Sequence, residues 1–350
     1  MSIRRTRTKS ASLLLLALGG ILAATLTACS SGGDSAAGAV KVALPGGPNV
    51  SLTPYLAADG SGAFAKQGVD VETQEFATGV DALAALSGGS VDIAAVGGLD
   101  MIRAGAQNAD LVSIFVPLPS SGSAVIAAKG LEAEHGTDIA SFADSRWGYA
   151  REGTSSTFYL QTVAEKSGVN WNQTERAALG SQAAILAALQ ADRIDLVTMD
   201  ATTAAKAVDS GVGYVVLNMS DPAVTKDYWG PQLGSSFATT QKFIDEHPDR
   251  VQGFVTGMIQ ALKDIQASGS DAQTVYDMFT PDVQKLFGDS WSGQWAIANA
   301  PFKNADGLLT DELLNNTVDW AKSVGALPAD LTLPPSERFI NNSFVENASS

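Results

Sequence analysis

Two stretches of the chain repeat one pattern: residues 82–98 read ALAALSGGSVDIAAVGG, and residues 185–201 read ILAALQADRIDLVTMDA. Each stretch begins with two leucines three residues apart, a spacing typical of one face of a helix. A tight turn follows, and then a short apolar run of the kind found in buried parallel strands. Each copy therefore predicts a helix, a turn, a strand and a break.

The flanking segments extend the match, because a Gly-Val pair at 68–69 and another at 168–169 each follow a predicted helix and begin a strand. Helices alternate with strands, which predicts an α/β fold of two similar lobes with largely parallel sheets covered on both faces. The expected elements are strands at 40–44, 69–76, 123–129 and 147–150, and helices at 55–66 and 154–166.

Beyond residue 231 the pattern becomes mainly helical, and Pro248 begins a long amphipathic helix to about residue 267. We expect these C-terminal helices to pack on lobe one. Two segments rich in Pro, Gly and Ser, near 117–123 and 229–235, are typical of hinge crossovers between lobes. The predicted boundaries are 40–119 and 232–350 for lobe one, and 120–231 for lobe two.

The N-terminal residues predict where the protein works. Four basic residues precede an apolar run of about a dozen residues, and small residues then lead to Cys29, the only cysteine. The run is shorter than the ~20 residues that a spanning helix needs. Its order resembles a bacterial lipoprotein signal, which implies removal of residues 1–28 and lipid on Cys29. Residues 29–39 would then form a flexible tether; the alternative for Cys29 is a buried structural cysteine.

The charge balance disfavours some partners. Removal of residues 1–28 leaves 18 basic against 37 acidic residues, a net charge of −19. Nucleic acid is therefore an unsuitable partner, and we expect a monomer. With Cys29 acylated, no disulfide is possible. His135 and His247 lack metal-ligand spacing, so we expect neither a metal nor a cofactor.

Candidate site residues follow from a rule for parallel α/β sheets, in which ligands bind where strands stop and helices begin. Helix starts expose unpaired N–H groups that bind anions or carbonyl oxygens. The selected residues are Gly47, Pro48, Asn49, Thr78, Gly79, Gly97 and Gly98 in lobe one, and Arg151, Thr154, Ser155, Ser156, Gln182, Asp200 and Trp229 in or beside lobe two.

Several of these residues also have an ordinary structural interpretation. The hydroxyls of residues 154–157 exceed the needs of one helix cap, and we expect at least one of them to be a cap. Asp200 is equally suited to capping and to ligand contact, where it would select a donor such as an amine. Trp229 is either an aromatic wall or core. Arg151 would favour an anionic ligand in the cleft, whereas Glu152 would oppose one.

The motifs at 55–75 and 88–97, with matching segments at 153–156, 187–191 and 243–248, resemble the substrate-binding proteins of ABC importers for nitrate, alkanesulfonates, taurine and thiamine-precursor pyrimidines. The resemblance implies a periplasmic-binding-protein type 2-like fold. Two departures affect the pocket wall: Ala201 stands where relatives often have Pro, and Thr157 and Phe158 replace a common His or Tyr.

The expected function is capture of a small solute in the cleft and delivery to an ABC permease, from the outer face of the cytoplasmic membrane. Chemistry is not expected, because no nucleophile elbow, phosphate loop or dinucleotide fingerprint occurs. The alternatives are a two-lobed enzyme of unknown chemistry and a sensor or adhesion lipoprotein with the same fold.

Overall fold

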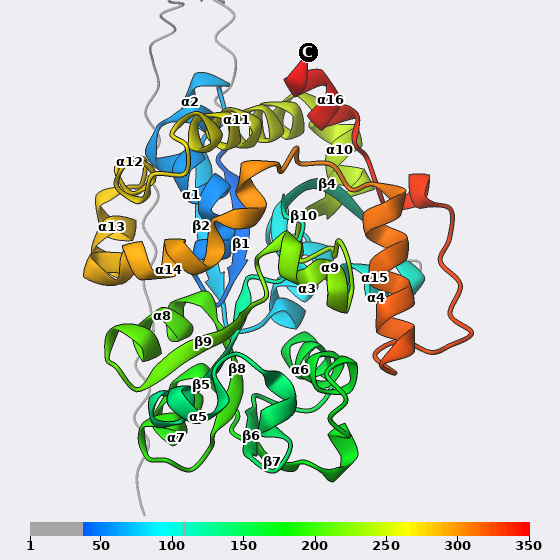
Figure 1. The fold of residues 1–350 in the computed structure, drawn as a ribbon. Coiled ribbons are helices and arrows are strands. Elements are labelled where there is room, and N and C mark those ends of the chain that lie inside the picture. Colours follow the sequence, from blue (N-terminus) through cyan, green and yellow to red (C-terminus); the bar gives the residue numbers. More distant parts are fainter. Residues whose placement is uncertain (1–37, 108–109) are drawn as a thin grey trace, which may run out of the picture. The chain divides into compact units, whose positions relative to one another are not determined.

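A computed structural model describes residues 38–107 and 110–350, and residues 38–350 form one compact unit. The predicted signal, Cys29 and nearly all of the predicted tether lie outside the described residues. The unit contains two five-stranded sheets (Figure 1). We call the first sheet with its covering helices lobe one, and the second sheet with its helices lobe two.

The first sheet has the order β2-β1-β3-β10-β4, and the second has the order β7-β6-β8-β5-β9. The first comprises β1 (Val40–Pro45), β2 (Val71–Phe76), β3 (Ile93–Gly97), β4 (Leu111–Leu118) and β10 (Ser235–Thr240). The second comprises β5 (Ser123–Ala128), β6 (Arg146–Tyr149), β7 (Glu175–Ala178), β8 (Leu196–Asp200) and β9 (Gly213–Asn218).

Each sheet is mixed, because one strand runs against the other four. That strand is β10 in lobe one and β5 in lobe two, and each is the first strand after a crossing. The chain leaves a lobe at the end where its strands stop and enters the other lobe at the same end. The entering strand must therefore run back along the sheet. The predicted largely parallel sheets are confirmed, with this exception in each lobe.

The helices match the predicted alternation, with one break. Gly62 adopts a φ of 70°, which ends one helix and starts another inside the expected helix at 55–66. The helices are α1 (Thr53–Gly60), α2 (Ala63–Lys66), α3 (Gly79–Ser87), α4 (Gly98–Ala106), α5 (Glu132–His135), α6 (Ser155–Lys166), α7 (Gln182–Gln190), α8 (Ala201–Asp209), α9 (Pro222–Tyr228), α10 (Gln241–Glu246), α11 (Pro248–Ala267), α12 (Ala272–Tyr276), α13 (Pro281–Phe287), α14 (Trp291–Ala298), α15 (Asp311–Ser323) and α16 (Ser343–Ser349).

The aspartate that both copies of the repeat share has the same structural role in each lobe, because it joins two strands at their starts. In lobe one, Asp92 accepts a hydrogen bond from the backbone N–H of Lys41 at 2.8 Å and donates its own N–H to the Lys41 carbonyl. In lobe two, Asp195 makes the same pair of bonds with Arg146, the first at 2.7 Å. The aspartate therefore fixes the pairing of the central parallel strands in both lobes.

The repeat also reproduces its turns and caps. Thr78 and Ser181 are the N-caps of α3 and α7, and each side chain accepts a backbone N–H three residues on at 3.2 Å. Gly89 and Asp192 hold the same place in the turn, with φ of 72° and 52°. The two lobes are thus built from one local plan.

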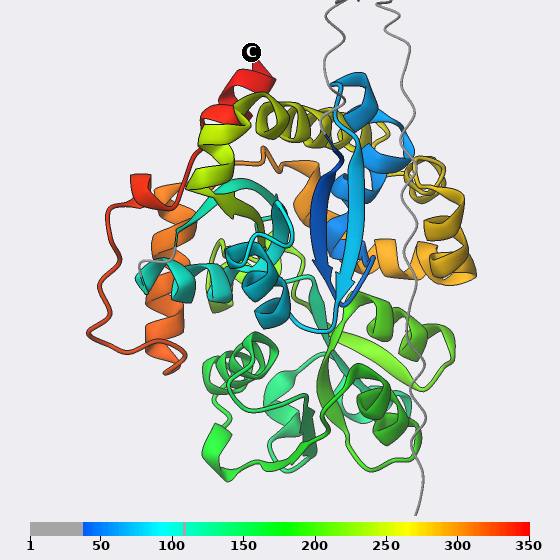
Figure 2. The same ribbon diagram turned by 180° about the vertical axis from the view of Figure 1, so that it is seen from behind.

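Both faces of the first sheet are covered. On β1, Val42 and Leu44 belong to one hydrophobic cluster and Ala43 belongs to another. The first cluster includes α1, α2 and α11; the second includes α3 and α4, which lie in front of this sheet in the view from behind (Figure 2). The predicted packing of C-terminal helices on lobe one is confirmed for α11 and α15, whereas α14 also packs against α8 of lobe two.

One close backbone approach joins the start of α4 to the second crossing. A Cβ atom on Gly98 would lie 1.7 Å from the carbonyl oxygen of Leu233, far inside contact distance. The N–H of Gly98 donates to the Gly234 carbonyl at 3.1 Å, and the N–H of Gly234 donates to the Leu118 carbonyl at 3.1 Å. Glycine at 98 lets the two crossings run against the α4 start.

Asp195→Asn is expected to lower the free energy of unfolding at pH 7 by about 1–3 kcal/mol, because Asp195 also accepts two side-chain bonds from Arg146, at 2.9 and 2.6 Å. Burial tends to raise the pKa of Asp195, but the bonds from Arg146 outweigh this and lower it. The stabilisation should be complete above the unfolded pKa of about 3.9 and be lost as the pH falls through the lower folded pKa.

Urea unfolding between pH 8 and pH 3 measures this, with exposed Asp70→Asn as the control that should stay within about 0.5 kcal/mol. A difference between wild type and Asp195→Asn that does not shrink below pH 4 would contradict the linkage.

Gly98→Ala is expected to lower the free energy of unfolding by about 1–3 kcal/mol, because the new methyl group forces the Leu233 carbonyl away. Gly130→Ala is the matched control, since a Cβ there meets nothing within 4 Å. Thermal unfolding of the two variants checks this, and equal losses would mean that the close approach is not formed.

Candidate functional site

A cavity of about 300 Å³ lies between the lobes where the crossings run. Its walls come from the ends of strands, the starts of helices and the C-terminal helix α15. The lining residues are Ser51, Gly97, Gly98, Leu99, Leu118, Ser121, Gly122, Ser123, Ser155, Ser156, Tyr159, Asp200, Leu233, Gly234, Ser235, Thr317 and Trp320. Both lobes therefore contribute to one site, at the end of the sheets where the sequence predicts it.

Three helix starts meet at this cavity. Gly98 begins α4 in lobe one, Ser155 begins α6 in lobe two, and Asp200 is the N-cap of α8. The first turn of a helix leaves N–H groups without partners inside the helix and carries partial positive charge. The cavity can therefore bind an oxygen-bearing group without a basic side chain.

Asp200 is a helix cap, one of the two roles that the sequence left open for it, and it also lies in the wall of the cavity. Its Oδ1 accepts the backbone N–H of Thr203 at 2.7 Å and so caps α8, while the residue also lines the cavity. The Asp200 N–H donates to Oε1 of Gln182 at 3.3 Å. Among the described residues that line the cavity, Asp200 alone carries a charge. Its counterpart in lobe one is Gly97, so the repeat differs where the cavity is.

The hydroxyl cluster divides into two pairs. Thr154 stands at the N-cap of α6, but its side chain makes no capping bond. Thr154 and Thr157 both donate to the Arg151 carbonyl, at 2.9 and 2.7 Å. Ser155 and Ser156 line the cavity instead. The expectation that a hydroxyl of this cluster makes a side-chain capping bond is wrong. The hydroxyls of Thr154 and Thr157, which lie near the start of α6, bond to the Arg151 carbonyl instead.

The structure places five of the predicted site residues together, namely Gly97, Gly98, Ser155, Ser156 and Asp200. The other predicted residues do not line this cavity, although two of them form hydrogen bonds with residues that do. Those outside its lining are Gly47, Pro48, Asn49, Thr78, Gly79, Arg151, Thr154, Gln182 and Trp229.

Two of the residues outside the lining support ones inside it. Asn49 accepts the N–H of Ser51 at 3.1 Å, and Gln182 holds the Asp200 backbone. Thr78 caps α3.

Two charged residues, Arg151 and Glu152, lie in the loop before α6, and the side chain of Glu152 is hydrogen-bonded. The Tyr149 hydroxyl donates to Oε1 of Glu152 at 2.6 Å. Arg151 is exposed, and its carbonyl accepts the two threonine hydroxyls. Neither charged side chain lines the cavity, so neither of the effects on an anionic ligand that the sequence suggested for Arg151 and Glu152 applies at its wall.

Two aromatic residues that the sequence did not indicate line the cavity in place of Trp229. Tyr159 and Trp320 stack with ring centroids 4.3 Å apart and an angle of 13° between the ring planes. Trp229 packs behind Tyr159, with centroids 4.7 Å apart. Burial raises the pKa of the Tyr159 hydroxyl well above its ordinary value, so this group stays protonated. Tyr159 lies one helical turn after Ser155 and could have been found; nothing in the sequence links Trp320 to α6.

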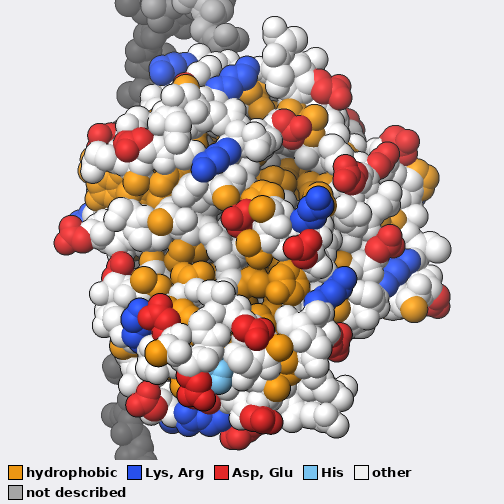
Figure 3. All heavy atoms as spheres, viewed as in Figure 1, with side chains coloured by type: hydrophobic (Ala, Val, Ile, Leu, Met, Phe, Trp, Pro, Cys, Tyr) orange, Lys and Arg blue, Asp and Glu red, His pale blue; other side chains and the backbone are white. Residues whose placement is uncertain are grey.

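A second cavity, of about 470 Å³, lies beside the crossings. Its lining comes mainly from the two crossings, from α9 and from the loop after α14, and it includes a proline from each of these segments. Figure 3 shows apolar side chains at the surface in the region where the lobes meet on this face. The lining of this second cavity includes two charged residues, Lys226 and Glu312.

The histidines lie away from the interlobe cavity. His135 Nδ1 contacts the Ser141 hydroxyl at 2.9 Å, and His247 precedes α11. Within residues 38–107 and 110–350, no group of three His, Cys, Asp or Glu side chains is placed to hold a metal ion. In the same ranges no helix has the length and apolar character needed to cross a membrane.

Three solved structures share this fold. The periplasmic aliphatic sulphonate binding protein SsuA from Escherichia coli has a TM-score of 0.67 at 18% identity, over 87% of this chain and 92% of that chain. The periplasmic nitrate-binding protein NrtA from Synechocystis PCC 6803 gives 0.64 at 14%, over 89% and 88%. The ligand-binding component of an ABC-type import system from Staphylococcus aureus gives 0.65 at 14%, over 89% and 98%.

The family comparison agrees with the fold. A search of curated proteins finds no match to the sequence. The model of the NMT1-like family matches residues 35–276, more than half of the chain and including the whole of lobe two. The predicted resemblance to solute-binding proteins of ABC importers is thereby confirmed, and the chain belongs to the NMT1-like family.

Proposed function

We propose that the protein captures a small solute between its lobes and delivers it to an ABC import permease. The observation that carries this proposal is the interlobe cavity, where helix starts from both lobes meet. A solute that contacts both lobes binds the closed form better than the open form and shifts the equilibrium toward closure. A permease can then distinguish the loaded protein by its shape.

The lining favours a solute with both an oxygen-bearing end and a hydrogen-bond donor. Helix starts and the hydroxyls of Ser155 and Ser156 suit sulfonate, carboxylate or carbonyl oxygens. Asp200 suits an amine or an amino group, and no Lys or Arg of the described part of the chain lines the cavity. Of the expected solutes, taurine-type aminosulfonates fit both features. Aminopyrimidines offer Asp200 an amino group and offer the helix starts a ring nitrogen as acceptor in place of an oxygen, whereas nitrate offers Asp200 no donor. The volume is at the small end of ligand sites.

The location follows from the predicted signal. Cys29 would carry the lipid and hold a monomeric protein on the outer face of the cytoplasmic membrane. The acidic surface of the exported protein, at −19 without residues 1–28, supports solubility rather than binding to nucleic acid.

The two alternatives predict different behaviour. An enzyme of the nucleophilic type would need an activated nucleophile in the cavity, but the lining formed by the described residues contains neither Cys nor His, so its serines have no histidine base there. A sensor or adhesion protein would need no permease. Uptake of the solute by cells, with and without the gene, separates the transport function from that alternative.

A thermal-shift screen tests the capture proposal, using a form that begins after Cys29. A compound at 100 times its Kd should add about 2.7 kcal/mol to the free energy of unfolding. We expect shifts with taurine or aminopyrimidines and none with nitrate. A shift with nitrate alone would contradict the assigned solute class.

Asp200→Asn is expected to leave the fold intact, because Asn is an equally good N-cap. It should weaken binding of an amine-bearing solute about tenfold or more, through loss of a charge-assisted hydrogen bond. Asp221→Asn is the control, since Asp221 also caps its helix, α9, by accepting the backbone N–H of Ala223 at 2.8 Å, and it does not line the cavity. Titration calorimetry measures both; an unchanged Kd for Asp200→Asn would reduce Asp200 to a cap.

Cys29→Ser is expected to move the protein from the membrane fraction to the soluble fraction, because no acyl chain can then be attached. Detergent phase partitioning and mass measurement of the mature N-terminus check this. Retention of the variant in the detergent phase would contradict the lipid anchor.

A further inference from the structure

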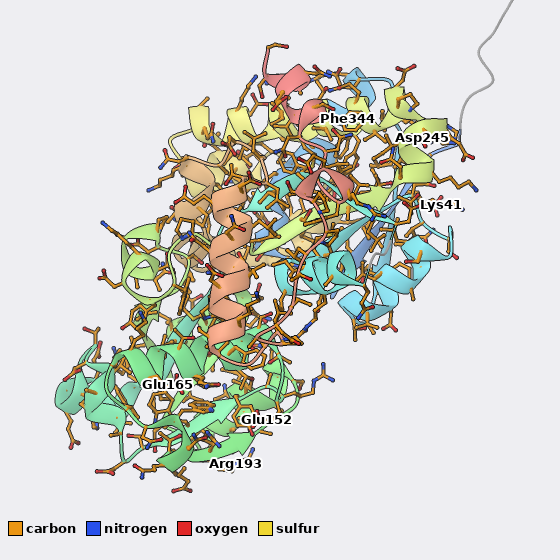
Figure 4. All side chains as sticks on the ribbon, turned by 90° about the vertical axis from the view of Figure 1, so that its right-hand side faces the viewer. Lys41, Glu152, Glu165, Arg193, Asp245 and Phe344 are labelled. Carbon is orange, nitrogen blue, oxygen red and sulfur yellow. The ribbon has the colours of Figure 1, made fainter. Side chains whose placement is uncertain are left out.

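Helix α15 belongs to lobe one by its contacts. The hydroxyl of Thr317 accepts the backbone N–H of Leu233 at 2.8 Å, and Arg103 of α4 donates to the Ala326 carbonyl just beyond α15 at 3.2 Å. Figure 4 shows α15 extending from lobe one down to lobe two, close to α6, which carries the labelled Glu165. Lobe one therefore holds α15 at Thr317 and again just past its C-terminal end, and the same end of the helix lies close to lobe two.

Trp320 is the residue with which α15 meets lobe two. Its Nε1–H donates to the Thr162 hydroxyl of α6 at 2.9 Å in a buried position, and its ring stacks on Tyr159. Trp320 and Tyr159 are each only 6% exposed, although both line the cavity. The indole has a single donor, and Thr162 uses it. Trp320 therefore offers a solute an apolar surface only.

We propose that Trp320 is the specificity-determining wall of the interlobe cavity, and that its docking on Thr162 accompanies closure of the lobes. The inference rests on the proposed function. Because the ring is carried by lobe one and docks on lobe two, this wall is complete only when the lobes are together. The contact of α14 with α8, where Thr202 donates to Gln294 at 2.7 Å, also joins the lobes but contributes no lining residue.

A double-mutant cycle tests the docking without any solute. The variants are Thr162→Val, Trp320→Phe and the two combined, each lacking the Trp320–Thr162 bond. We expect each single variant to lower the midpoint of thermal unfolding by about 2–4 °C. The loss in the combined variant should be clearly smaller than the sum of the single losses. Fully additive losses would overturn the proposal.

Two further variants isolate this bond. Thr162 also donates to the Phe158 carbonyl at 2.9 Å, and Thr174 makes the same kind of bond to the Trp171 carbonyl at 2.9 Å, away from the cavity. Thr174→Val is therefore the matched control and should not couple to Trp320→Phe. Thr162→Ser keeps the hydroxyl and should restore the wild-type midpoint.

Calorimetry with taurine, 3-aminopropanesulfonate and 4-aminopyrimidine tests the specificity. Trp320→Phe should keep the wild-type order of affinities, whereas Trp320→Ala should weaken the best compound at least about tenfold and reduce the discrimination among the three. Unchanged affinities in Trp320→Ala would overturn the proposal. If none of the three binds wild type, the proposed solute class fails, and the coupling of Trp320 to Thr162 still decides whether the wall is formed.

Discussion

The paired aspartate bonds at the base of each sheet are the constraint on which the site depends. Asp92 joins the start of β3 to β1, and Asp195 joins the start of β8 to β6. Each bond sets the register of the two parallel strands, so their ends lie at the same level of the sheet. The helix starts that follow β3 and β8 are then placed together at the opposite end of each sheet. Gly97 and Asp200 occupy equivalent positions there. The carboxylates of Asp92 and Asp195, at the opposite ends of these strands, thus help to set the position of the cavity.

Duplication of a local plan also explains where the lobes differ. The caps, the left-handed turn residues and the strand-joining aspartates are alike in both copies because each satisfies the same backbone groups. The position that faces the cavity differs between the copies. In lobe one it is Gly97, which has no side chain, and in lobe two it is Asp200, which has a carboxylate. Because of this asymmetry, lobe two places a carboxylate in the cavity wall, which the proposed function uses to recognise a donor group, and lobe one makes the close backbone approach at Gly98.

Much of this could be predicted from the sequence, because helix periodicity, strand runs and turn glycines act over short distances. The repeat predicted the lobes, and the rule for strand ends predicted Gly98, Ser155 and Asp200. The antiparallel course of β5 and β10 was not predicted, since it depends on the end at which the chain enters a sheet. Trp320 was missed for a related reason, because it lies more than 150 residues from Thr162 in the sequence.

The central place of β10 has a consequence for how the chain acquires its structure. Among the described strands of the first sheet, β4 pairs with β10 alone, which in turn pairs with β3, and the other edge of β4 bonds to the backbone of residues 307 and 339–341. Residues 119–234 must therefore leave the ribosome or the export channel before β4 gains its partner. Lobe two is continuous from β5 to β9 and can form without waiting for later residues. We expect lobe two to fold first and the exposed edge of β4 to be the segment most in need of protection during export.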